Sequence, residues 1–267
     1  MIPRLKDILD LIENFAPSRL AETWDNPGLQ VGSFNQAITK ILLSLDPTLK
    51  AVRSARNLNA QVLLTHHPLI FRPLSHLENS SYPGNVIFEA IKNEIAVVAA
   101  HTNLDTAWGG INDILADIFE LRDVVILKEI EEESGFGLGR IGDLPETMEM
   151  SVLVEKVKNV LGTDKLRIVG QANQLINRMA VVGGSGGSLV SAAFKKGADL
   201  ILTGDVSHHN ALEAEFSGLA LIDGGHFRME KVAFDIFGNR LKSLIAERGW
   251  EMTVEVNINE DDPMRDG

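Results

Sequence analysis

Six of the seven histidines follow a predicted buried strand directly or begin the helix after one. They form four groups at the ends of apolar segments: His66 with His67, His101, His208 with His209, and His226. In a fold of parallel strands the carboxyl ends of neighbouring strands meet at one edge, so side chains distant in sequence converge there. Converging imidazoles can bind a metal ion or transfer protons.

The segment GGHFRMEK begins a predicted helix just after the apolar run LALID. His226 and Glu230 are four residues apart in it and therefore share one helix face. Taken alone, such a pair is typical of a solvated helix surface. The histidine groups at other strand ends supply partners, and together they favour metal ligands.

The adjacent histidines of HHPLIF, His66 and His67, raise a question of direction. Successive strand residues point to opposite faces, so the pair would hold two separate ions unless the strand has already turned at Pro68. A polar loop ending in proline explains this segment equally well. In HTNLD, His101 and Asp105 leave the next strand together, and Asp105 is either an oxygen ligand or a helix cap.

Two other segments favour an anionic substrate. In GDVSHHNALEA, Asp205 or Ser207 is expected to cap a helix. His208 and His209 then lie in its first turn, where the helix dipole attracts negative charge, and we assign them to substrate binding or proton transfer.

The glycine-rich loop GGSGGS (183–188) contains Ser185 and Gly186 and joins a predicted strand to a helix. Its N–H groups could bind a phosphate, although the segment lacks the standard nucleotide-binding fingerprints. A flexible turn between the two elements explains the loop equally well.

Apolar segments alternate with helical patterns along the chain, which predicts an α/β protein with mostly parallel sheets. QVLLTHH resembles DLILTGD, and IAVVAAHTNLD resembles LALIDGGHFRME, which indicates two related lobes. We place the lobes at 1–130 and 131–267, with the junction near the glycine-rich segment GFGLGRIGDL and the metal site between them.

Composition excludes several classes of function. The absence of cysteine excludes disulfides, thiolate metal sites and a cysteine nucleophile, and it is typical of a cytoplasmic protein. The net charge of −12 argues against nucleic acid as a partner, because binding phosphates needs clustered Lys and Arg. Apolar runs are too short to cross a bilayer, and the acidic tail NEDDPMRDG is expected to be solvated.

Seven motifs occur in the order seen in GTP cyclohydrolase I type 2 homologues, the NIF-three-like proteins, which this chain resembles over about residues 24–231. They are WDNPGLQVG, LLTHHPLIF, AAHTNLDTAWGGINDILA, GRIG, GGSGGSL, GDVSHHNALEA and LIDGGHFRMEK. Longer members carry an inserted ferredoxin-like domain where this chain has only EIEEES, so it resembles the short form.

The resemblance implies two divalent metal ions, of zinc, manganese or iron, held between two lobes. Motif matching assigns five ligands, with Glu230 bridging the ions: His66, His67, Asp105, His226 and Glu230. His101 lies in an outer position or carries protons, as His209 could. The resemblance also implies a homo-oligomer, the toroidal hexamer that family members form. Their last motif often has Ala-Thr where this chain has Arg228 and Met229, and Arg228 adds a cation suited to a phosphate-bearing substrate.

The function expected from these residues is a metal-dependent hydrolase that acts on a small molecule such as a nucleotide, with possible GTP cyclohydrolase activity. Two alternatives use the same residues differently. One is a metal-storage or metal-delivery protein without catalysis, and the other is a ring-shaped regulatory scaffold.

Overall fold

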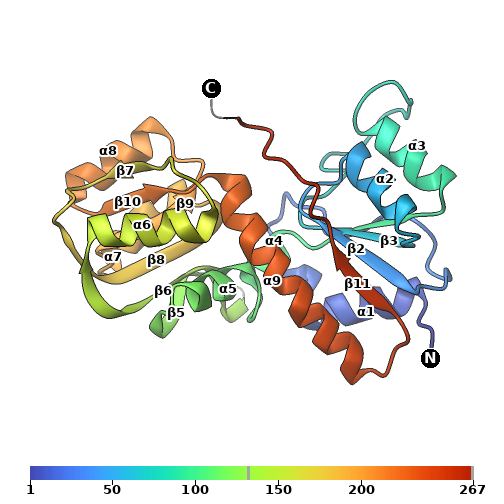
Figure 1. The fold of residues 1–267 in the computed structure, drawn as a ribbon, viewed down its shortest axis with the longest axis horizontal. Coiled ribbons are helices and arrows are strands. Elements are labelled where there is room, and N and C mark those ends of the chain that lie inside the picture. The colour runs from blue at the N-terminus through green and yellow to red at the C-terminus, as the bar shows by residue number, and fades with distance from the viewer. Residues whose placement is uncertain (131–132, 266–267) are drawn as a thin grey trace. The chain divides into compact units, whose positions relative to one another are not determined.

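The computed structural model describes residues 1–130 and 133–265, and the chain forms two units in it (Figure 1). The first unit contains Met1–Leu104 and the described residues from Phe234 onward, and the second contains the described part of Asp105–Ala233. The expected lobes were 1–130 and 131–267. In the structure residues 105–130 belong to the second unit, and the chain from Phe234 returns to the first. The EIEEES segment includes residues 131 and 132, which lie outside the described part.

The first unit contains a five-stranded sheet in the order β1-β4-β3-β2-β11. Its strands are β1 (Gly28–Val31), β2 (Lys40–Ser44), β3 (Val62–Thr65), β4 (Ala96–Ala99) and β11 (Thr253–Val256). Neighbours among β4, β3, β2 and β11 pair in parallel, whereas β1 is antiparallel to β4. The carboxyl ends of β2, β3 and β4 therefore lie along one edge of this sheet, as the sequence predicts.

Helices cover both faces of this sheet. They are α1 (Leu5–Phe15), η1 (Ser18–Leu20), α2 (Leu49–Asn57), α3 (Gly84–Lys92) and the part of α9 (His226–Glu247) that lies in this unit. Leu42 of β2 packs with Val52 of α2 and Ile87 of α3. The next residue, Leu43, faces the opposite side, where it approaches Gly238 of α9. This alternation buries the strands on both faces.

The second unit contains a six-stranded sheet in the order β5-β6-β8-β9-β10-β7. Its strands are β5 (Arg122–Ile130), β6 (Glu133–Glu149), β7 (Arg167–Val169), β8 (Leu175–Ser185), β9 (Leu200–Gly204) and β10 (Ala220–Asp223). The α/β class is confirmed, but only β8, β9 and β10 run parallel, so this sheet is mixed. The segment expected to be a junction is instead strand β6, which pairs with β5 and β8.

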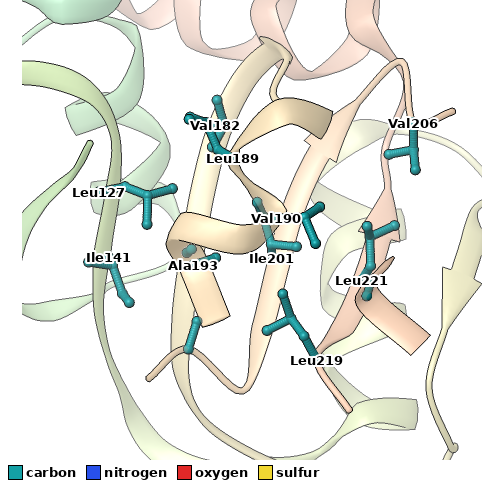
Figure 2. Packing of buried hydrophobic residues seen from close by; sticks show 13 residues of the cluster. Leu127, Ile141, Val182, Leu189, Val190, Ala193, Ile201, Val206, Leu219 and Leu221 are labelled. Atoms are coloured by element: carbon teal, nitrogen blue, oxygen red, sulfur yellow. The ribbon is translucent and has the colours of Figure 1, made fainter. Parts of the chain in front are cut away.

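Helices of the second unit pack on its mixed sheet, and Figure 2 shows the core on one face. They are α4 (Thr102–Thr106), which begins in the first unit, α5 (Ile111–Ile118), α6 (Met150–Leu161), η2 (Gly187–Leu189), α7 (Val190–Lys195), α8 (His208–Ser217) and the start of α9. Val190 of α7 packs in this core with Ile201 of β9 and Leu221 of β10. On β8, Val182 belongs to this core, whereas the next residue, Gly183, faces Ile111 of α5.

The chain ends in the first unit. After α9, strand β11 pairs with β2, and the tail continues along the end of β2. Oε1 of Glu260 accepts hydrogen bonds from Ser44 Oγ at 2.7 Å and from the Asp46 N–H at 3.2 Å. The acidic tail, expected to be solvated, is thus attached at Glu260 to a strand end. Within the described residues, none of the helices is sufficiently long and apolar to cross a membrane.

Candidate metal centre

Three histidines of the first unit lie together at the carboxyl edge of its sheet. His66 and His67 follow β3, and His101 follows β4. One ring nitrogen from each lies within 4.8 Å of the other two. Strand β3 ends at Thr65, so the alternation that would separate adjacent side chains no longer applies. The sequence left open whether the two rings point to opposite faces or lie together after a turn. In the structure they lie together.

The Nδ1 atom of each of these rings contacts an oxygen acceptor. His66 Nδ1 lies 2.8 Å from the carbonyl oxygen of Ala100, and His67 Nδ1 lies 2.7 Å from Oδ1 of Asp46. His101 Nδ1 lies 2.7 Å from Oδ1 of Asp25. A carbonyl or carboxylate oxygen only accepts, so Nδ1 carries the proton and Nε2 carries the lone pair in the neutral ring. Histidines that bind metals in proteins are oriented in this way.

Short hydrogen bonds fix the chain where His67 leaves the strand. Thr65 Oγ1 donates to the carbonyl oxygen of His67 at 2.7 Å, and the His67 N–H donates to the carbonyl oxygen of Leu45 at 3.0 Å. Asp46 is held in turn by the bond from its N–H to Glu260. The acceptor that orients the His67 ring is therefore itself held in position.

Asp25 has an unusually low pKa. Burial alone would raise it, but hydrogen bonds from His101 and Thr102, together with the charge of His101, lower the pKa from 3.8 to about 2. Thr102 donates to Oδ2 through both its N–H and its hydroxyl. Asp25 is consequently ionised at neutral pH and can stabilise positive charge on His101.

The second unit contains a histidine with the same kind of support. His226 begins α9, and its Nδ1 lies 2.7 Å from Oδ2 of Asp205. Its Nε2 lies 3.0 Å from Oε2 of Glu230, one helical turn later. The Glu230 side chain is only 4% exposed. The pair that the sequence places on one helix face is thus a buried carboxylate beside an oriented imidazole, which is unlike a solvated surface.

Asp105 lies in α4 and is buried, and its carbonyl oxygen accepts a hydrogen bond from Asn112 Nδ2 at 2.8 Å. The residue before α5 is Gly110, so Asp105 does not cap that helix. Its role as a metal ligand stays a prediction.

The residues expected to bind substrate belong to the second unit, whereas the three-histidine group belongs to the first. Ser207 caps α8, and His208 and His209 are exposed in its first turn, as expected. Ser185 is exposed, whereas Gly186 is buried and its N–H donates to Thr203 Oγ1 at 2.8 Å. Among the described residues, none of these belongs to a group with metal-ligand spacing. Arg228 is half-buried in the first turn of α9.

Sequence reasoning missed the three aspartates that orient the rings. Asp25 and Asp46 each stand beside a turn containing proline, in WDNPG and LDP, and such segments are typical of loops without chemistry. The sequence around Asp205 predicts only a helix cap. The available signal was that Asp46 and Asp205 each follow a strand directly or within one residue, as the histidines do.

Comparison with known proteins identifies the group to which the chain is related. The family model described as Duf34/NIF3 (NGG1p interacting factor 3) matches residues 3–263. The chain belongs to this family. The NIF3 resemblance found in the seven motifs is thereby confirmed over nearly the whole sequence.

Several NIF3 relatives cover almost the same length. A GTP cyclohydrolase 1 type 2 homolog of Clostridium perfringens is 40% identical, with 85% of this chain and 87% of that protein covered. A protein of Helicobacter pylori named GTP cyclohydrolase 1 type 2 is 36% identical, with the same coverage. The crystal structure of a Bacillus cereus protein related to NIF3 covers 100% of both chains with a TM-score of 0.93 and 27% identity.

Proposed function

We propose that this NIF3 protein is a metal-dependent hydrolase that holds two divalent ions and acts on a nucleotide or a related phosphate-bearing compound. The observation that supports it is the orientation of four imidazoles, each with Nδ1 on an oxygen acceptor. The proposed ligands His66 and His67 belong to the first unit. Asp105, His226 and Glu230 belong to the second.

The donor chemistry fits a divalent transition metal. Imidazole nitrogen and carboxylate oxygen suit zinc, manganese and iron, and the chain has no thiolate that would favour softer ions. Three ring nitrogens lie within 4.8 Å of one another, and each of the three rings is held through Nδ1 by a carbonyl or carboxylate oxygen, as histidines at metal sites are. The residues present therefore fit the group that the family resemblance implies.

When bound, such ions supply a nucleophilic water near neutral pH and polarise the group that it attacks. The proposal gives His101 the transfer of protons, because ionised Asp25 on its Nδ1 stabilises the positive ring that forms when Nε2 accepts a proton. Arg228 supplies a cation for the phosphates. The names of the curated relatives make ring opening of GTP the first reaction to test.

The test combines metal content with turnover. Wild type, His66→Ala and Glu230→Gln are purified without added metal, and bound metals are measured by mass spectrometry. Each is then assayed with GTP and a panel of nucleotides and phosphate esters. The matched control is His76→Ala, because His76 lies in an exposed loop where its Nδ1 contacts only Ser75 Oγ among the recorded hydrogen bonds of the described residues.

We expect about two ions per chain in wild type and in His76→Ala, with fewer ions and little turnover in the other two variants. Full metal content and undiminished turnover in Glu230→Gln would contradict the assignment. If His66→Ala and Glu230→Gln lose metal but wild type turns over none of the substrates, the result would instead support metal storage or delivery.

A further inference from the structure

Strand β8 departs from regular pairing just before it ends. Val181 pairs with Leu202 of β9, but Ser185 pairs with Gly204, so β8 has two more residues than β9 over this stretch. Bulges of this kind bend a strand and redirect the residues near its end. Gly184 lies within the bulge and has a φ of +60°, a conformation that disfavours residues with a side chain.

The missing side chain of Gly184 leaves the space that Glu230 fills. A Cβ atom on Gly184 would lie 2.1 Å from Oε1 of Glu230 and 3.1 Å from its Cδ. It would also lie 3.4 Å from Cε1 of His226. The other carboxylate oxygen, Oε2, lies 3.0 Å from Nε2 of His226. Oε1 of Glu230 therefore occupies the space beside Gly184, and Oε2 contacts the His226 ring.

Buried polar side chains hold this bulge in place. The Gly183 N–H donates to Oδ1 of Asn112 at 2.9 Å, and the Gly186 N–H donates to Oγ1 of Thr203 at 2.8 Å. The Thr203 hydroxyl donates to the Gly184 carbonyl oxygen at 3.2 Å. Asn112 and Thr203 are both buried. Two N–H groups of the segment expected to bind phosphate are therefore already used to shape the bulge.

We propose that Gly184 is a positioning residue for the Glu230 carboxylate, and that the GGSGG bulge acts as a rigid support for this metal ligand. The inference rests on the proposed function insofar as Glu230 is a ligand. The contact itself lies within the second unit and does not depend on metal. A methyl group at Gly184 would displace the end of the Glu230 side chain and change the direction in which its oxygens point.

The first test measures metal affinity of Gly184→Ala by competition with a chelator. The matched control is Gly162→Ala, because Gly162 ends α6 with a φ of +61° and a Cβ there would meet nothing within 4 Å. Both glycines have a φ near +60°, which disfavours a side chain, but only a Cβ at Gly184 would meet Glu230. We expect about 10- to 100-fold weaker binding for Gly184→Ala and unchanged binding for Gly162→Ala. Equal affinity of the two variants would overturn the proposal.

A second test uses the metal-free protein and remains informative if wild type binds no metal. The midpoint of thermal unfolding is measured for Gly184→Ala and Gly162→Ala, with and without Glu230→Ala. We expect the larger loss in Gly184→Ala to fall to that of the control once the Glu230 carboxylate is removed, because the contact is then relieved. The same excess loss in both backgrounds would overturn the proposal. A wild type without metal but with this coupling would contradict only the proposed function.

Discussion

The Nδ1 atom of His67 lies 2.7 Å from Oδ1 of Asp46, a residue 21 positions earlier at the end of the neighbouring strand. The contact joins β3 to β2 across the carboxyl edge of the first sheet. Because Asp46 is held by Glu260 through its own N–H, the ring orientation depends on three segments distant in sequence.

Replacement of Asp46 by alanine is expected to weaken metal binding by about 10- to 100-fold, because the His67 ring loses the acceptor that fixes its tautomer. Chelator competition measures the change. Asp261→Ala is the control, because the Asp261 carboxylate is exposed and its ion pair, with Lys50, lies on the surface. A similar small effect in both variants would show that Asp46 does not orient a ligand.

The low pKa of Asp25 predicts a dependence of stability on acid pH in metal-free protein. Its pKa is lowered in the folded state from 3.8 to about 2, so the stabilisation is fully present above pH 4 and is lost as pH falls toward 2. The shift corresponds to about 2 kcal/mol. Urea unfolding between pH 2.5 and 6 should show this loss in wild type, with the difference from Asp25→Asn shrinking toward low pH. A difference independent of pH would contradict it.

Removal of metal should destabilise wild type. If the free metal concentration is 1,000 times the dissociation constant, chelation lowers the free energy of unfolding by about 4 kcal/mol per site. Thermal unfolding with and without a chelator measures this loss. His66→Ala should respond much less, and His76→Ala should respond like wild type. Identical responses of all three proteins would place the metal elsewhere.

The ion pair of the buried Arg140 with Asp113 is expected to stabilise the fold whether or not metal is bound. Its guanidinium contacts both carboxylate oxygens of Asp113, at 2.5 and 3.1 Å, and lies 4.7 Å from the centre of the Trp108 ring. Asp113→Ala leaves a buried charge without its carboxylate and should cost about 3–5 kcal/mol.

The matched comparison is Asp143→Ala, which breaks the more exposed pair with Arg178 and should cost about 1 kcal/mol or less. Chemical unfolding of both variants tests the difference. Equal losses would indicate that the Arg140 charge finds another partner when Asp113 is removed.

The sequence predicted the positions of the candidate site histidines better than the elements around them. Apolar runs such as QVLLT and IAVVAA predict buried strands, and His66, His67 and His101 follow these strands. The three side chains lie together because the carboxyl ends of parallel strands meet at one edge of the sheet. The glycines of the GFGLGRIGDL segment predict a junction, because glycine is common in turns. It is a strand because pairing on both sides, to β5 and β8, outweighs local preference.

The partners of the rings could not be predicted, for a different reason. Asp25 is 76 residues from His101, and nothing in the intervening sequence relates them. Such contacts follow from strand order, and the antiparallel pairing of β1 with β4, which was not expected, brings the WDNPG segment to the end of β4. The role of Gly184 likewise could not be predicted. From the sequence alone, a glycine that makes room for a carboxylate looks the same as a glycine in a flexible turn.

The first unit is assembled from two segments that flank the second unit in the sequence, because β11 and the Glu260 contacts come from residues after it. During synthesis, the whole of the second unit leaves the ribosome before β11 does. Until then β2 is an open edge, and the strand end that carries Asp46 lacks its acceptor from the tail. The hydrogen bond from Asp46 to Glu260, and with it the support for the His67 ring, can therefore form only after the second unit has been synthesised.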